Sequence, residues 1–367
     1  MNTTTDPKDQ ISKVSIGMAV PPLITTIIPT YRRPKLLRRA IKSALNQTYS
    51  HLRVCVYDDA SNDETADVVA DLIKEDSRVS YYCHSKNVGS LGNYNYGLKN
   101  VQTPLFSLLS DDDILLPEFY EAAIKSLDAY PEAAFCATEV IGMKTDGTIM
   151  ETANSTWGDG YYLPPEGLLA MFENGHHPPI WTGTLFRTIV IEHIGLFDEE
   201  VGGTYDRDYT QRIAARFPYV KSKVPGAIYL SNPLSESVGS DHSLAWPGSL
   251  QMIRNLTDDS SISSVIREQV SLYLTKALKL RIIAYGKQYI KDKKYDNAYR
   301  IADILYSHLD AKLWALIIYA TAKCCQYIPY LHSVLLFFID LCRRLSSRRR
   351  IVSIPDTKNY ARYLNEM

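Results

Sequence analysis

Pro104-Leu-Phe-Ser-Leu-Leu-Ser-Asp-Asp-Asp113 indicates the fold and the chemistry of this chain most directly. Its apolar half is typical of a buried strand, and three carboxylates follow with only Ser110 between them. Open α/β sheets bind ligands at the carboxyl ends of their strands. Adjacent carboxylates repel one another unless a cation lies among them, and Mg²⁺ and Mn²⁺ prefer such oxygen ligands. Asp is also favoured in turns and at helix N-caps, so the stretch alone leaves a metal site and a solvated acidic turn both open.

Length and composition set the broad class of protein. The 367 residues suffice for one large α/β domain and a smaller partner. A net charge of −1 gives no global field that would attract nucleic acid, so none is expected as a partner. The six cysteines include no C-x-x-C pair, so we expect no disulfide framework or zinc site and a reducing, cytoplasmic location.

Patterns of strand and helix alternate between residues 23 and 140. Helices are expected to open at Pro34, near Asp63 and at Pro117. The expected strands are residues 23–28, 52–57, 78–83, 104–109 and 133–140. This alternation predicts an α/β fold with a doubly wound, mostly parallel sheet.

The rest of the chain gives the expected domain organisation. Residues 1–20 are polar and aperiodic, so we interpret them as a flexible lead-in rather than a signal peptide. Turns dominate residues 144–179, strands are expected at 180–186 and 224–230, and residues 231–248 are expected to form a loop or lid. Beyond residue 250 the pattern is nearly all helical, so we expect an α/β domain over residues 21–248 and a helical region over 249–367.

The helical region carries two short apolar runs, residues 313–319 and 334–339, followed by arginines at 343, 344 and 348–350. Lys323 and Pro329 interrupt the apolar sequence, which argues against a membrane-spanning helix. Short apolar helices beside a basic cluster suit a membrane interface, with arginines on anionic headgroups. A dimer face or helical core with a solvated basic tail is the alternative.

Polar clusters follow three of the expected strands, at Pro29–Arg33, Asp58–Asp63 and Asp111–Asp113. A parallel sheet brings such clusters to one edge. That edge would hold an aromatic face, carboxylates for ring N–H or ribose hydroxyl groups, and carboxylates for a metal, which together suit a nucleotide diphosphate. The chain has no G-x-x-x-x-G-K-[ST] loop and no G-x-G-x-x-G after a strand, which excludes P-loop and Rossmann dinucleotide sites.

With these motifs the chain resembles the inverting family 2 glycosyltransferases of the GT-A fold, in particular those that build bacterial cell-surface polysaccharides. The resemblance runs through residues 23–230 with order and spacing kept. The matching stretches are Ile28-Pro-Thr-Tyr-Arg-Arg33, Asn46-Gln-Thr48, Val56-Tyr-Asp-Asp-Ala-Ser-Asn-Asp63, Asn87-Val-Gly89, Asn95-Tyr-Gly97, Ser110-Asp-Asp-Asp-Ile-Leu-Leu-Pro117, Gly195-Leu-Phe-Asp198 and Tyr205-Asp-Arg-Asp-Tyr-Thr-Gln-Arg212.

The resemblance implies a donor and metal site. Thr30, Tyr31 and Asp59 would contact the base and ribose of a nucleotide sugar, for which UDP is the favoured carrier. Asp111 would reach the ribose, and Asp112 would ligate the Mn²⁺ or Mg²⁺ that bridges the diphosphate. Asp113 would line the donor sugar or support the metal shell. The other residues expected at the donor site are Pro29, Arg33, Asp58, Asn87 and Trp181, the last as a floor beneath a sugar.

The resemblance also implies that Asp206 is the general base, with Asp208 as second choice. A helix N-terminus would keep either carboxylate ionised, although N-capping is the simpler role for both. Two residues depart from the family pattern. Tyr205 stands where Glu is common before the base, and Ser110 takes the first place of the usual Asp-x-Asp-Asp.

Three loop histidines, His176, His177 and His242, are further candidates to reach the metal. His242 is the best of them because it falls in the expected lid, but loop histidines are more often solvated.

The leading hypothesis is therefore a metal-dependent glycosyltransferase that extends a glycan or lipid-linked acceptor for surface polysaccharide or glycolipid synthesis, peripheral on the cytoplasmic face of the cell membrane. A sugar-nucleotide pyrophosphorylase would need a Gly-rich phosphate loop with Lys after the first strand, which is absent. An aspartate-nucleophile phosphatase would need Asp-x-Asp-x-Thr, and Asp58-Asp-Ala-Ser61 differs. A non-catalytic docking protein on the same scaffold stays open, as does a homodimer.

Overall fold

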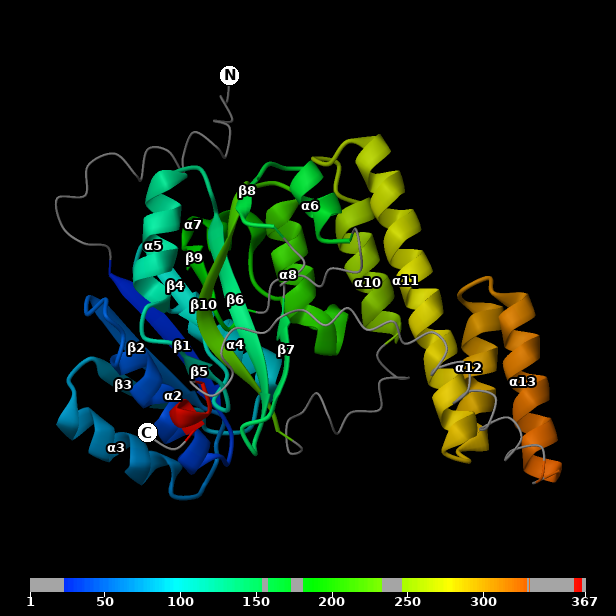
Figure 1. Cartoon of the computed structure of the whole chain (residues 1–367), viewed down its shortest axis with the longest axis horizontal. Coiled ribbons are helices and arrows are strands. Elements are labelled where there is room, and N and C mark those ends of the chain that lie inside the picture. The colour runs from blue at the N-terminus through cyan, green and yellow to red at the C-terminus, as the bar shows by residue number, and fades with distance from the viewer. Residues whose placement is uncertain are drawn as a thin grey trace. The chain divides into compact units, whose positions relative to one another are not determined.

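A computed structural model describes residues 23–153, 158–172, 181–232, 246–328, 330 and 360–364 (Figure 1). The chain divides into two compact units, residues 1–239 with 354–367 and residues 240–353, which are described separately below.

The first unit is built on one large mixed sheet. Its parallel half has the order β3-β2-β1-β4, formed by β1 (Ile24–Thr30), β2 (Leu52–Asp58), β3 (Val79–Cys83) and β4 (Leu105–Leu108). Thr30 pairs with Asp58 in the register of β1 and β2, so both strands end in polar residues at the same level. The expected doubly wound sheet with mostly parallel strands is thereby confirmed in this half.

The other half of the sheet introduces antiparallel pairs. β9 (Thr184–Arg187) runs antiparallel to β4 and to β6 (Phe135–Lys144), and β10 (Tyr219–Ser231) runs parallel to β6. Short antiparallel strands complete it: β5 (Ile114–Leu115), β7 (Ile149–Ala153) and β8 (Gly160–Tyr162). Residues 144–172 therefore contain β7, β8 and α6 (Glu166–Ala170), where the sequence indicated only turns.

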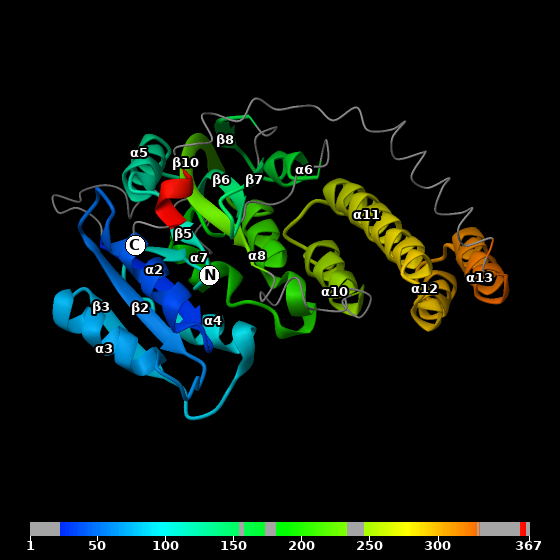
Figure 2. The same cartoon turned by 60° about the horizontal axis from the view of Figure 1, so that its bottom comes forward.

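Helices cover both faces of the sheet, as Figure 2 shows. On one face, the main apolar core packs under α2 (Pro34–Leu45), α3 (Thr65–Glu75) and α5 (Phe119–Ala129). The opposite face carries α4 (Gly89–Lys99), in a stretch that the sequence analysis interpreted only as polar and punctuated by glycine. Gly97 allows this close packing, because a Cβ there would lie 2.6 Å from Cγ2 of Ile27. The remaining elements are α7 (Ile189–Ile194), the 3-10 helix η2 (Glu199–Thr204) and α8 (Tyr205–Ala214).

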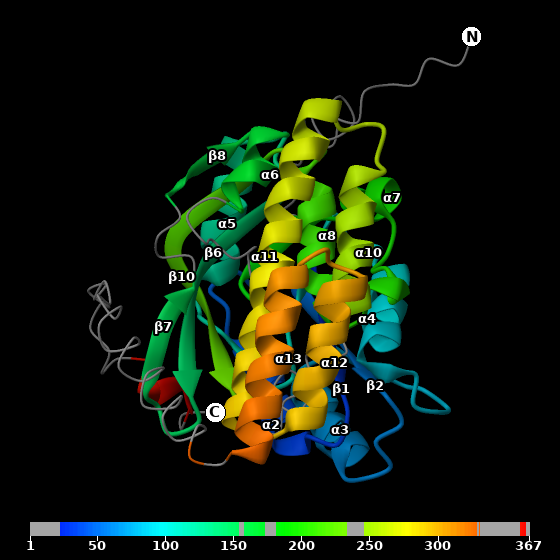
Figure 3. The same ribbon diagram turned by 90° about the vertical axis from the view of Figure 1, so that its right-hand side faces the viewer.

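The second unit is entirely helical in its described part, with α10 (Trp246–Thr257), α11 (Ser264–Lys291), α12 (Tyr295–Ser307) and α13 (Lys312–Tyr327). Figure 3 shows α11, α12 and α13 side by side. Gly286 marks where the three meet, since a Cβ there would lie 2.6 Å from Ile318 of α13 and 2.9 Å from Ile301 of α12. Within the described residues, no helix combines the length and the apolar character needed to cross a bilayer.

A short 3-10 helix, η5 (Ala361–Leu364), returns the chain to the first unit. Tyr360, Tyr363 and Leu364 pack against a small apolar cluster beside the acidic triplet. The cluster consists of Ile114, Leu116, Ile141, Met143, Ile228 and Leu230.

Candidate active site

The three polar clusters meet at one edge of the sheet, as the strand pattern predicted. The Thr30 hydroxyl donates to Asp111 at 2.8 Å, which joins the end of β1 to the acidic triplet. The Asp59 amide donates to the Thr30 carbonyl oxygen at 3.0 Å, which joins the end of β2 to the same point.

Asp58 and Asp59 are adjacent, but they make different contacts. Asp58 is buried, and it accepts hydrogen bonds from the amide and hydroxyl of Ser61 and from the hydroxyl of Tyr81, the last at 2.6 Å. Oδ1 therefore holds the loop after β2, in which Ala60 and Asn62 adopt left-handed φ values of 59° and 52°, while Oδ2 contacts β3 through Tyr81. Non-glycine residues in that conformation are sparse and cluster at functional sites. This placement gives Asp58 a supporting role in the loop after β2.

Asp59 faces the start of α4. Its two carboxylate oxygens accept hydrogen bonds from the amides of Val88, at 2.6 Å, and Gly89, at 2.9 Å, and Asn87 donates to its backbone carbonyl oxygen at 3.3 Å. A carboxylate has about four lone-pair directions, so two protein donors leave it able to accept from a ligand.

Tyr31 is an exposed aromatic side chain at this edge, with 41% of its surface accessible. The Arg32 guanidinium lies 5.0 Å from its ring centroid, and the Arg32 amide donates to the Ser61 hydroxyl at 2.9 Å. Pro29 lies inside β1 and is buried, so it shapes the strand end beneath Tyr31.

The three carboxylates of the acidic triplet lie in three different environments. Asp113 is 1% exposed, and its oxygens accept from the Thr182 hydroxyl at 2.6 Å and the Leu230 amide at 2.9 Å. Asp111 accepts from Thr30 and, at 3.1 Å, from Arg33. For the Asp112 carboxylate, the described residues supply one long bond, 3.3 Å from Arg33. The Asp112 carboxylate thus has the weakest hydrogen bonding to the protein, whereas the Asp113 carboxylate is fixed by two short hydrogen bonds.

The electrostatics of the triplet favour a bound cation. Burial raises the pKa of Asp111 to about 6, although the nearby Arg33 opposes the rise. Burial also raises the pKa of Asp112, and burial with the neighbouring Asp112 charge raises that of Asp113 well above its ordinary value. Two guanidinium groups, those of Arg33 and Arg39, therefore lie beside three crowded carboxylates, and a divalent ion would relieve the remaining repulsion.

The protein would supply few ligands to that ion. Within the described ranges, no group of three or more His, Cys, Asp or Glu side chains is placed to hold a metal. His176, His177 and His242 lie outside the described residues. Mg²⁺ commonly binds through one or two carboxylates plus water and substrate phosphates, so the oxygen donors around Asp112 fit such an ion.

An aromatic cluster that sequence reasoning missed lies next to the triplet. The ring of Trp181 lies 4.4 Å from that of Tyr94, 5.4 Å from that of Tyr205 and 5.5 Å from that of Phe197. Asn95 fixes the arrangement by donating to the Phe197 carbonyl oxygen at 3.0 Å and accepting from its amide at 2.9 Å. Trp181 is therefore part of an aromatic platform. The stretches Asn95-Tyr-Gly97 and Gly195-Leu-Phe-Asp198, which the sequence analysis names, contain the residues Asn95 and Phe197 that hold it.

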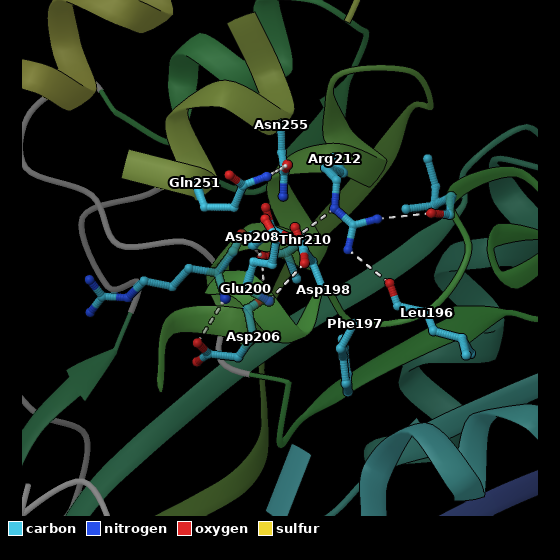
Figure 4. Close-up of polar contacts among 12 residues, drawn as sticks. Leu196, Phe197, Asp198, Glu200, Asp206, Asp208, Thr210, Arg212, Gln251 and Asn255 are labelled. Atoms are coloured by element: carbon cyan, nitrogen blue, oxygen red, sulfur yellow. Dashed lines mark hydrogen bonds and ion pairs between the residues drawn. The ribbon is translucent and has the colours of Figure 1, made fainter. Parts of the chain in front are cut away.

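The two candidate bases on α8 differ sharply (Figure 4). Asp208 is fully buried and accepts from Nε of Arg212 at 2.7 Å, and Arg212 also donates to the carbonyl oxygens of Ile194 and Leu196. Asp206 is partly exposed and accepts from the Arg207 amide at 2.8 Å, and burial raises its pKa. The placement favours Asp206 as the accessible carboxylate and gives Asp208 a structural contact.

A hydroxyl pair connects α8 to the start of α4. Oγ of Ser90 and the hydroxyl of Tyr205 lie 2.9 Å apart. Ser90 follows Gly89, whose amide binds Asp59, and Tyr205 precedes Asp206. The Tyr that departs from the family pattern therefore bridges the two parts of the site.

Sequence comparisons agree with this geometry. The family model described as glycosyl transferase family 2 matches residues 25–195. An uncharacterized glycosyltransferase of Rickettsia typhi is 30% identical over 190 residues, which cover 51% of this chain and 57% of the relative. A GalNAc(5)-diNAcBac-PP-undecaprenol beta-1,3-glucosyltransferase of Campylobacter jejuni is 41% identical over 96 residues, 26% of this chain and 31% of that protein. The chain thus spans 57% of the length of the first relative and less of the second.

Solved structures share the fold at low sequence identity. S. aureus TarS 1-349 in complex with UDP-GlcNAc gives a TM-score of 0.60 at 15% identity over 82% of this chain and 90% of TarS 1-349. The mannosyltransferase PcManGT from Pyrobaculum calidifontis, in complex with GDP-Man and Mn²⁺, gives 0.51 at 14% identity over 98% of this chain and 92% of that one. The similarity to glycosyl transferase family 2 thus lies in the α/β unit, over residues 25–195, and these solved structures share its fold.

Proposed function

We propose that this protein is an inverting, metal-dependent glycosyltransferase that transfers a sugar from a UDP-sugar to a hydroxyl group of a glycan or lipid-linked acceptor. The observation that carries the proposal is the difference among the triplet carboxylates. Two are held by protein donors, and Asp112 is left for an ion at the edge that also presents Tyr31 and Asp59. UDP is favoured as carrier because TarS binds UDP-GlcNAc, although the other neighbour binds GDP-Man.

The donor would lie across the ends of β1 and β2. The exposed Tyr31 ring offers a stacking face for a base, and the Asp59 carboxylate can accept from a ring N–H or a ribose hydroxyl. Arg33, which now faces Asp111 and Asp112, would add positive charge beside a diphosphate. When bound at Asp112, a divalent ion would supply the charge that stabilises a departing diphosphate.

Asp206 would act as the general base. It would accept the proton of the acceptor hydroxyl while that oxygen bonds to the anomeric carbon, and the nucleoside diphosphate would leave from the opposite face with its bonding electrons. A single displacement of this kind inverts the configuration at the anomeric carbon. A pKa raised by burial makes Asp206 a stronger base, and its active, ionised form is lost as the pH falls through that pKa.

The acceptor is proposed to be lipid-linked, which would place the enzyme at the cytoplasmic face of the membrane in surface polysaccharide or glycolipid synthesis. The name of the Campylobacter jejuni relative specifies an undecaprenol-linked acceptor, which supports this choice. The chemistry of Asp206 requires only a hydroxyl group and does not depend on the lipid.

Calorimetric titration tests the donor site directly. Purified protein is titrated with UDP, GDP and dTDP, each with and without Mn²⁺. We expect UDP to bind at least about tenfold more tightly with the metal, because the ion would neutralise charge shared by the triplet and the diphosphate. Failure of every nucleotide to bind, with or without metal, would refute the proposal and favour a non-catalytic docking protein.

Tyr205→Phe tests the bridge between donor loop and base. Removing the hydroxyl breaks the 2.9 Å contact with Ser90 but keeps the ring in the aromatic platform. A hydrogen bond contributes about 1 kcal/mol, so we expect kcat to fall roughly fivefold with little change in UDP affinity. Ser90→Ala serves as the matched variant, and the double variant should be no slower than either single one. Additive losses would show that the two hydroxyls act separately.

A further inference from the structure

The net charge of −1 conceals an uneven distribution between the two units. Residues 240–353 carry 17 Lys and Arg against nine Asp and Glu, a net charge of +8. The rest of the chain carries 23 against 32, a net charge of −9. A unit with this excess of cations attracts anionic surfaces, and its own copies repel one another.

Helix α13 presents an exposed apolar face in this basic unit. Ala315, Ile318, Ala322 and Cys325 are its buried residues. On the opposite side, Leu313, Leu316, Ile317 and Tyr327 are 70%, 64%, 42% and 72% exposed. These four residues define the outer α13 face. Their spacing puts them on one stripe of a helix, so the exposed apolar area is continuous rather than scattered.

The polar residues of α13 are suited to negatively charged partners. The helix contains no Asp or Glu, and its two charged residues are Lys312, its first residue, and Lys323. Lys323 lies 5.5 Å from the ring centroid of Tyr319, a partly exposed aromatic residue. Apolar, aromatic and cationic side chains together are the composition of helices that lie in a bilayer interface.

We propose that the outer α13 face lies on an anionic lipid bilayer. This inference rests on the proposed function in one respect, because a lipid-linked acceptor would reside in the same membrane. Apolar side chains would enter the boundary between headgroups and acyl chains, while Lys312 and Lys323 meet anionic headgroups. At 16 residues, α13 is about 24 Å long, which is too short to cross the hydrocarbon core but suits a helix lying flat.

Charge decides among the possible occupants. A second copy on the same face would bring two units of net charge +8 together, at an electrostatic cost that a bilayer with anionic lipids does not impose. The apolar run Val334–Ile339 could cover α13 within one chain, but that would leave the excess of cations uncompensated. An anionic bilayer would both bury the apolar face and neutralise the positive charge.

Vesicle sedimentation of the full chain tests the proposal. The vesicles consist of phosphatidylcholine alone or with about one third phosphatidylglycerol, an anionic lipid. Wild-type protein should bind the anionic vesicles, and the partition coefficient should fall steeply with added salt. Leu316→Ser/Ile317→Ser should lower it at least about tenfold, because two apolar side chains lose their burial. Leu272→Ser is the matched control, since Leu272 is 71% exposed but lies on α11, and it should bind as wild type does.

Three outcomes would overturn the proposal. Equal binding to both kinds of vesicle would show that the protein does not require an anionic lipid surface. A dimer in sedimentation velocity that Leu316→Ser/Ile317→Ser dissociates, without vesicle binding, would assign the face to a second copy. A monomer that binds no vesicle would indicate cover from within the chain. Vesicle binding needs no donor or acceptor, so a protein that binds the anionic vesicles but transfers no sugar would leave this inference intact and refute the proposed function.

Discussion

Asp112→Asn is expected to abolish metal-dependent nucleotide binding. Among the other described residues, Arg33 donates to the Asp112 side chain through a long bond of 3.3 Å, so replacing Asp112 costs the fold little. It removes the negative charge best placed to hold a cation. UDP affinity in Mn²⁺ should therefore fall to the metal-free value, a loss of at least about tenfold, which is the factor expected from omitting the metal. The calorimetric titration above measures the loss.

Two comparisons make this result specific. Asp71→Asn changes an exposed carboxylate on α3 that pairs with Lys74, and it should bind UDP as wild type does. Asp113→Asn should instead lower the melting temperature, because Asp113 is buried and accepts from Thr182 and Leu230. Unchanged metal-dependent binding in Asp112→Asn would move the metal site away from this residue.

Asp206→Asn is expected to eliminate sugar transfer and preserve donor binding. The amide cannot accept the proton of the acceptor hydroxyl, so kcat should fall by about 10²–10⁴-fold, the usual contribution of a general base. UDP affinity should stay within about twofold of wild type, because Asp206 lies on α8 while the proposed donor contacts lie on β1, β2 and the triplet. The rate of sugar transfer is measured as the rate of UDP release, with each acceptor tested in turn.

Asp208→Asn is the contrasting variant for this test. It would break the 2.7 Å ion pair with Arg212, whose side chain also holds the carbonyl oxygens of Ile194 and Leu196. Loss of one partner of a buried pair costs about 3–5 kcal/mol, so a lower melting temperature should be its main effect. Near-normal transfer by Asp206→Asn would make the assignment of the base wrong, and Asp208 would be the next residue to consider.

The parallel half of the sheet could be predicted because its signal is local. Short apolar runs in the sequence predict strands such as Ile24–Thr30 and Leu52–Asp58, and parallel pairing then aligns their polar ends. Helix α4 was missed because Gly89, Gly92 and Gly97 lower helix propensity, and tertiary packing of Gly97 against Ile27 outweighs that preference. The α7–α8 region shows the same limit, since Arg212 joins residues 16 and 18 positions apart.

The distinct environments of neighbouring carboxylates could not be predicted from the sequence. Asp58 and Asp59 are adjacent and chemically identical, yet one braces a loop through Ser61 and Tyr81 and the other caps α4. In the triplet, Asp113 is distinguished by Leu230, which lies 117 positions away. Such differences depend on long-range contacts, which no local pattern records.

The packing of Tyr360, Tyr363 and Leu364 against the cluster around Leu230 also has a consequence for how the protein is made. The helical unit lies between Leu230 and Tyr360 in the chain, so a ribosome must translate all of it before this cluster can be covered. At about 5–20 residues per second, that interval lasts roughly 6–26 seconds. During that time the apolar patch next to the acidic triplet lacks the cover of Tyr360, Tyr363 and Leu364, so we expect chains that stop short of these residues to expose it.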